Sequence, residues 1–267
     1  MGKHENSQKV YDRALAEYLR YSHSALERAI AGFERVVELE TASEPKPKKS
    51  GYLLRLAHAR LAQAHAMHEI PRRHVAYDAD AVVAHMKQAE LHADKATDPH
   101  TGGPVTAEQE AELSGLARNA MGLAAMYRSD DPSLTDEQKL NWLSHARGQL
   151  EDSASVRPDS WENACDRASV HMRTGTLTGD ASEFARAAAH LEHVLTDLRP
   201  GYPFARYELG RIHRLTGNFS EAIAAFEAVL AVPESERDVS DRRVRRELDR
   251  ARVANREFGL PRRRPSP

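Results

Sequence analysis

The chain has 267 residues, of which 29% are charged, and a formal net charge of −2 at pH 7. This balance excludes the basic excess of a general nucleic-acid binder and the acidic excess of a disordered tail. The only cysteine, Cys165, rules out an internal disulfide and any paired-cysteine metal motif.

Membrane and targeting signals are not found in the sequence. The first residues lack the apolar run of a signal peptide, and no stretch approaches the roughly 20 apolar residues that cross a bilayer. We therefore expect a cytoplasmic protein with no membrane partner. Arginine outnumbers lysine by 30 to 8, a bias that GC-rich bacterial coding would give, and we expect a bacterial source.

The pattern of apolar residues predicts an all-α chain. Helical spacing recurs throughout, and no segment alternates apolar and polar residues as a strand does. Helix starts are predicted where a side-chain acceptor is followed three residues later by Glu or Gln, at Ser24, Thr106, Thr135 and Asp180. Breaks are predicted at 43–51, 96–104, 128–135, 157–160, 174–180, 199–203 and 231–235.

Taken in chain order, the predicted helices form pairs. The first clear apolar stripe is made by Ala29, Phe33 and Val36. A second pair lies between residues 51 and 96, where the stripe of Val82, Met86 and Ala89 is one of several possible phasings.

Two later pairs combine a small residue with a bulky one. Gly122 precedes Ala146-x3-Leu150 by 24 residues, which implies a loop of about 12 residues between the two helices. Next, Ala187 and Leu191 follow a helix predicted from about residue 161 to 173, in which we place Cys165 at the small position.

The last helix pair has the clearest sequence pattern. Gly210 is the small residue of one helix, and Ala222-x3-Phe226 follows twelve residues later in the other. Gly217 makes the turn between them. Close packing of two helices that cannot bury their apolar faces alone requires such a small position opposite a bulky one.

This last stretch resembles the tetratricopeptide repeat, whose pattern is W-x2-L-G-x2-Y, then A-x3-F, then P. Here it reads Arg206-x2-Leu209-Gly210-x2-His213, then Ala222-x3-Phe226, then Pro233. Arg206 and His213 depart from the pattern.

The resemblance implies a right-handed α-solenoid of about five helix pairs over residues 1–258. Its last clear repeat is 203–235 and its capping helix is 240–258, while the Arg- and Pro-rich tail 259–267 is predicted to be disordered. It also implies a non-enzymatic scaffold that binds a protein or peptide segment in a concave groove.

Given the phase of the last repeat, the predicted partner-binding groove includes Tyr207, Arg211 and Arg214. The resemblance adds Asn119, which falls at a position that corresponds to the family's carboxylate clamp, although a full clamp is not present. The two arginines suit a partner with an acidic or carboxylate-bearing segment. Pairing of Arg211 and Arg214 with Asp166 or Glu162 is the structural alternative.

The alternative function is a helical metal-binding or enzymatic protein that uses a His58/His65/His68 cluster, with His85 and His92 in the next helix. The sequence has no HExxH motif and no Glu-x-x-His pair. We expect no catalytic residue, metal or cofactor. Arginines at 242–246 and 262–264 fit a solvated helix better than a nucleic-acid site, because acidic residues are interleaved with them.

Overall fold

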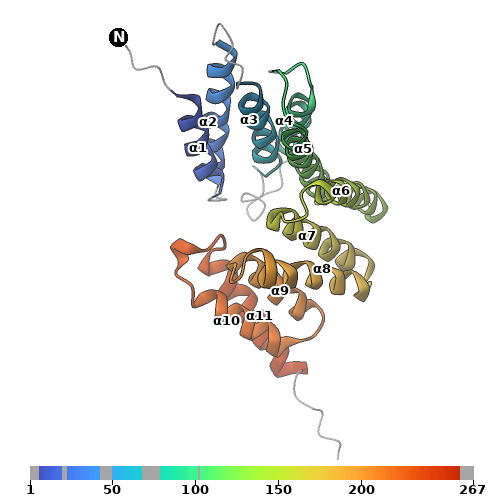
Figure 1. The fold of residues 1–267 in the computed structure, drawn as a ribbon. Helices are drawn as coiled ribbons and strands as arrows, with labels where there is room; N and C mark the ends of the chain where they lie inside the picture. The colour runs from blue at the N-terminus through green and yellow to red at the C-terminus, as the bar shows by residue number, and fades with distance from the viewer. Residues whose placement is uncertain (1–5, 20–22, 43–49, 68–78, 102, 259–267) are drawn as a thin grey trace, which may run out of the picture. The chain divides into compact units, whose positions relative to one another are not determined.

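A computed structural model describes residues 6–19, 23–42, 50–67, 79–101 and 103–258 (Figure 1). The described residues form helices and contain no strand, so the all-α prediction is confirmed. The helices are α1 (Ser7–Tyr18), α2 (His23–Ala42), α3 (Ser50–Met67), α4 (Ala79–Thr97), α5 (Ala107–Arg128), α6 (Asp136–Val156), α7 (Trp161–Thr178), α8 (Ala181–His193), α9 (Pro203–Leu215), α10 (Phe219–Leu230) and α11 (Asp241–Phe258). A π-helical turn (Val194–Leu198) follows α8, and a 3₁₀ turn (Glu234–Glu236) precedes α11.

The chain divides into two compact units, which we call the N-terminal unit (Met1–Asn163) and the C-terminal unit (Ala164–Pro267). The N-terminal unit contains α1 to α6, and α1 to α5 stand side by side in Figure 1. The C-terminal unit contains most of α7 and then α8 to α11. That both units belong to one array over residues 1–258 stays a prediction, and the predicted disordered tail 259–267 lies outside the described residues.

Two of the four predicted helix starts are full capping boxes. The hydroxyl of Thr106 accepts from the backbone of Gln109, and the side chain of Gln109 accepts from the backbone of Thr106 (3.2 and 2.9 Å). Thr135 and Gln138 repeat this exchange. Asp180 also caps its helix, through the backbone N–H of Ser182. Ser24 differs, because it lies inside α2, which begins at His23.

Close crossings hold the helix pairs together. A Cβ built on Gly210 would lie 2.8 Å from Cε1 of Phe226, and one built on Gly122 would lie 2.6 Å from Cγ of Leu150. Both predicted pairings are therefore confirmed, but α5 and α6 are joined by residues 129–135 alone rather than by a loop of about 12 residues, because α6 already begins at Asp136. In α7 the small position is Gly175 rather than Cys165, because Gly175 faces Phe184 of α8 at 3.2 Å.

The N-terminal unit has a continuous apolar core across α1 to α5. Ala29, Phe33 and Val36 of α2 are completely buried, as their stripe predicts. Phe33 packs on Tyr11 of α1 with ring centroids 5.5 Å apart. In α4, Val82 and Ala89 are buried, which supports the phasing chosen for that helix.

The last helix, α11, packs on α10 as the predicted cap does. Val244, Leu248 and Ala251 are buried in the core of the C-terminal unit, together with Phe226. Phe258, at the end of α11, is 73% exposed and takes no part in this core. No helix in the described ranges is long and apolar enough to cross a membrane.

We expect Gly210→Leu to destabilise the protein by about 1–3 kcal/mol, because its side chain would collide with Phe226. Urea unfolding, followed by circular dichroism, measures the effect. Gly148→Leu is the matched control, since no atom lies within 4 Å of a Cβ at that helical glycine. Equal stability of the two variants would contradict the crossing described above.

Candidate functional site

Two of the four predicted groove residues are buried. Tyr207 is 1% exposed, packs on Phe226 with centroids 5.8 Å apart, and accepts a hydrogen bond from Nε of Arg243 on α11 (3.0 Å). Burial raises the pKa of its phenol. The sequence predicts an exposed position for Tyr207, and the difference arises because α11 covers this part of α9. Whether a partner binds there stays a prediction.

Asn119 is also buried, on α5 of the N-terminal unit. It is 2% exposed, and its side-chain oxygen accepts from the amide of Gln63 on α3 (2.6 Å). The interaction satisfies a polar group inside a helix contact, where an unpaired amide would cost free energy. Asn119 therefore joins α3 to α5 instead of lining an open surface.

Arg211 and Arg214 lie on the surface of α9, each beside a buried carboxylate. Arg211 Nη1 donates to Glu208 (2.6 Å), and Arg214 Nε lies 3.0 Å from Glu247 of α11. The side chains of the two arginines are 28% and 23% exposed, while each glutamate side chain is 5% exposed. Glu208 and Glu247 are ion-pair partners that the sequence analysis did not name for these two arginines.

Three arginines of α11 complete the same site. Arg243 lies 3.7 Å from Glu208, while Arg250 and Arg246 lie 2.8 and 3.8 Å from Glu247. We call the five arginines the arginine cluster: Arg211, Arg214, Arg243, Arg246 and Arg250. Because they surround two carboxylates, the site keeps an excess of three positive charges.

The arginine cluster is suited to binding carboxylates. Each guanidinium has five N–H donors in a rigid plane, and one or two bonds to a buried glutamate leave the rest for other acceptors. The charge of Glu208 raises the pKa of Arg211, so this group stays protonated. Partial burial also strengthens any charged contact made there relative to bulk water.

Sequence reasoning located the two arginines of α9 but missed the glutamates and the contribution of α11. The Glu208–Arg211 and Glu247–Arg250 pairs have i, i+3 spacing, which is a readable signal. The contacts between α9 and α11 depend on how the two helices pack, and no spacing along the chain predicts them.

Histidines form a second polar cluster, between α3 and α4 of the N-terminal unit. Nδ1 of His58 lies 2.9 Å from Nδ1 of His92, and Nδ1 of His65 lies 3.0 Å from Nδ1 of His85. The rings of His65 and His92 stack with centroids 5.6 Å apart. The predicted trio is thus replaced by pairs with α4, and His68 lies outside the described residues.

These histidine pairs fit hydrogen bonds. Two nitrogens bound tetrahedrally to zinc, at about 2.0–2.1 Å each, would lie about 3.3 Å apart, which is wider than both pairs. Within the described ranges, no group of three or more His, Cys, Asp or Glu residues could hold a metal ion. Burial lowers the pKa of His58 and of His92 to about 4, with a smaller contribution from Lys95. Both rings are therefore neutral at pH 7, and in their pair one nitrogen donates while the other accepts.

A buried His–Glu pair joins α7 to α8 in the C-terminal unit. Nδ1 of His171 and Oε2 of Glu183 are 2.6 Å apart, and both residues are buried. Glu183 also accepts from Arg186 (2.8 Å). Cys165 is buried in the same unit. We assign the pair a structural role, since it satisfies polar groups at a helix contact.

Antiparallel helix pairs that meet at small residues define a helical repeat protein. No protein-family model matches the chain, and no curated protein matches it in sequence. Among solved structures it is similar to TTC0263, a tetratricopeptide-repeat protein of Thermus thermophilus, with 16% identity and a TM-score of 0.52 over 93% of this chain and 100% of that one. It is also similar to the TPR2AB domain of yeast Sti1 in its complex with pHSP90, with 13% identity and a TM-score of 0.35 over 92% and 98%.

The likeness to the Thermus protein shows that the chain has the tetratricopeptide-repeat fold. The resemblance predicted from the Leu209-Gly210 and Ala222-x3-Phe226 motif is confirmed at the level of the fold.

We expect the protein to lose stability as the pH falls from about 6.5 towards 4. His58 and His92 have a folded-state pKa of about 4, below the unfolded value of about 6.5, so the unfolded chain binds more protons in this range. The loss should be up to about 3 kcal/mol for each of the two histidines by pH 4. Urea unfolding at pH 7.5 and at pH 5 measures its onset.

The double variant His58→Leu/His92→Leu is the control for this pH dependence. The difference in unfolding free energy between pH 7.5 and pH 5 should shrink in the variant, although His190, whose pKa is also lowered to about 4, keeps part of it. An undiminished difference would show that the pair is not its source.

Proposed function

We propose that the protein is a non-enzymatic interaction module that binds a segment of another protein on the surface of its helix pairs. The observation that carries this proposal is the arginine cluster. It stands on two packed helices of a tetratricopeptide-repeat fold and keeps three positive charges beyond those that Glu208 and Glu247 neutralise. Stacked helix pairs present such surfaces to peptides and proteins.

The chemistry of the cluster favours an acidic partner. Planar guanidinium groups held by buried carboxylates are already oriented, so little side-chain freedom is lost when a carboxylate binds. Arg211 and Arg214 are the contact residues of this proposal. Tyr207 lies beneath another member of the cluster, since the guanidinium group of Arg243 is 5.1 Å from the centroid of its ring. We assign Asn119 to the framework of the N-terminal unit.

A non-enzymatic role is supported by the state of the reactive side chains. Cys165 and His171 are buried, and His171 is paired with Glu183. The histidines of α3 and α4 pair with one another. We also propose a cytoplasmic, bacterial protein whose two units form one array, and we do not propose nucleic acid as its partner.

Elemental analysis tests the alternative of a metal-binding protein. We expect natively purified protein to contain much less than one zinc or iron ion per chain, because Nδ1 of each of these histidines is engaged with Nδ1 of another. His58→Leu/His65→Leu should have the same metal content as the wild type. Stoichiometric metal that disappears in this variant would overturn the proposed function.

A peptide array tests the acidic-partner proposal. We expect the fluorescently labelled protein to bind acidic peptides in preference to neutral and basic ones. Arg211→Lys/Arg214→Lys should weaken this binding several-fold, because lysine keeps the charge but loses the planar fork. Reversal to glutamate is avoided, since it would place a carboxylate beside the buried Glu208 and Glu247.

Arg252→Lys is the matched control, since Arg252 pairs with Glu227 on another part of α10 and α11. Thermal melting of all three proteins should agree within a few degrees. Binding to the array that does not depend on the acidic content of the peptides would exclude this surface as the partner-binding site. Binding that is unchanged in the double variant would exclude it as well.

A further inference from the structure

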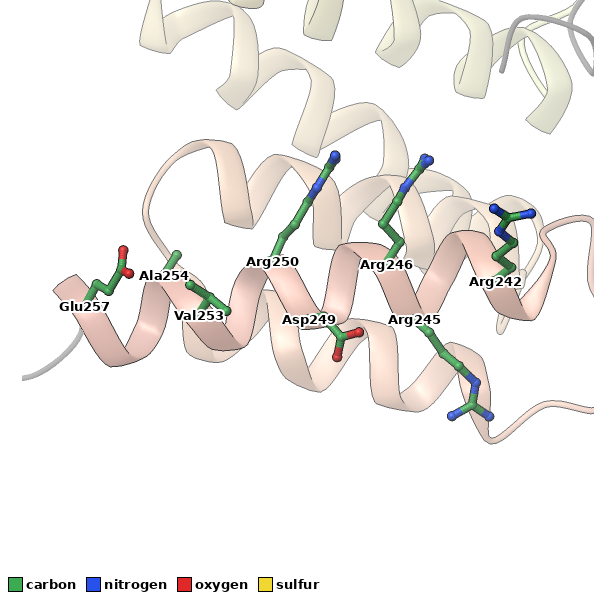
Figure 2. Close-up of a pocket in the computed structure, with 8 residues that line it drawn as sticks. All are labelled: Arg242, Arg245, Arg246, Asp249, Arg250, Val253, Ala254 and Glu257. Atoms are coloured by element: carbon green, nitrogen blue, oxygen red, sulfur yellow. The ribbon is translucent and has the colours of Figure 1, made fainter. Parts of the chain in front are cut away.

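The face of α11 that points away from the core is a second candidate surface. Val244, Leu248 and Ala251 face the core. On the outer face, Arg242, Arg246 and Arg250 point to one side of the helix, and Arg245 points to the opposite side (Figure 2). We call Arg242, Arg246 and Arg250 the arginine stripe, of which the last two also belong to the arginine cluster. The stripe lines a shallow hollow on the surface of α11.

The spacing of the arginine stripe is regular. Its members are four residues apart, so successive arginines rise by about 6 Å along the helix axis. Like charges at this spacing repel one another and destabilise an isolated helix. Glu247 holds Arg246 and Arg250 at 3.8 and 2.8 Å, whereas Arg242 makes no ion pair with any residue that the structure describes.

An exposed apolar residue, Val253, follows the arginine stripe towards the C-terminal end of α11. Val253 is 44% exposed, and Ala254 lies beside it in the same hollow (Figure 2). The charges of the stripe attract an oppositely charged partner. The exposed aliphatic side chain adds apolar area that becomes buried when the partner binds.

We propose that this face docks an acidic α-helix of another protein. Glutamate or aspartate residues at i, i+4 and i+8 of that helix match the arginine stripe, because residues four apart are separated by about 6 Å along the axis of either helix. An extended peptide advances by about 6.7 Å per two residues and drifts out of register along the stripe. An apolar residue one turn further along packs on Val253.

Charge decides between this occupant and a second copy of the chain. The outer face has four arginines against Asp249 and Glu257, so two copies would each bring an excess of two positive charges to the contact. An acidic helix is attracted instead. Asp249, at the edge of the stripe, is placed to meet a basic residue of that helix.

A designed peptide probes the site directly. The probe is an 18-residue, fluorescein-labelled alanine-rich helix with glutamate at i, i+4 and i+8 and one leucine in the next turn. Its isomer has the same composition, with the three glutamates distributed around the helix. We expect fluorescence anisotropy with the full chain to show at least fivefold tighter binding of the probe than of the isomer.

Matched variants connect this binding to the arginine stripe. Arg242→Gln/Arg246→Gln should weaken binding of the probe at least fivefold. Arg252→Gln/Arg256→Gln removes the same charge from residues of α11 that do not line the hollow and should change binding less than twofold. Circular dichroism melting checks that both variants are folded. Arg242→Gln alone changes no member of the arginine cluster and should still weaken binding of the probe, which separates this face from the surface proposed above.

Four outcomes would overturn the proposal. They are no binding of the probe, equal binding of the probe and its isomer, equal losses in the two double variants, and equally tight binding of a single-stranded DNA of the same charge. Self-association of the wild-type chain that Arg242→Gln/Arg246→Gln abolishes in sedimentation would assign the face to a second copy instead.

Discussion

The close approach of paired helices at small residues is the constraint on which the rest of the structure depends. At Gly122 and Gly210 a side chain of the partner helix occupies the space that a Cβ would need. This approach buries Leu150 and Phe226 completely, and it determines how each helix is rotated about its own axis. With Gly210 turned towards α10, the next residue, Arg211, is directed away from that contact.

The buried carboxylates then decide what the surface of the C-terminal unit can do. Glu208 and Glu247 are almost completely removed from water, and each is paired with arginines of α9 and α11. A buried charge without a partner would be strongly destabilising, so at least part of the arginine cluster is required by the fold. The same contacts orient the guanidinium groups that we propose to contact a partner. On that proposal folding and binding use the same side chains, and an experiment must separate the two by keeping the charge.

The sequence was sufficient wherever the deciding interaction is local. The capping box at Thr106 and the Gly210–Phe226 crossing both follow from residues within one helix pair. Tyr207 could not be placed in this way, because a helix from outside its pair covers it. The histidines are a similar case. Their helix was predicted, but the pairing of His58 with His92 depends on the rotation of α3 against α4, for which the alanine-rich sequence allowed several phasings.

Two buried polar clusters, one in each unit, are satisfied in opposite ways. Between α3 and α4, burial makes His58 and His92 neutral, so each ring satisfies the other and presents no charge at pH 7. In the C-terminal unit, Glu208 and Glu247 are surrounded by more arginines than their charge requires. The histidine pairs offer no charge to a partner, whereas the partly exposed guanidinium groups keep N–H donors that a partner's acceptors can reach. Recognition of a charged partner is therefore more consistent with α9 and α11 than with the histidine-rich helices.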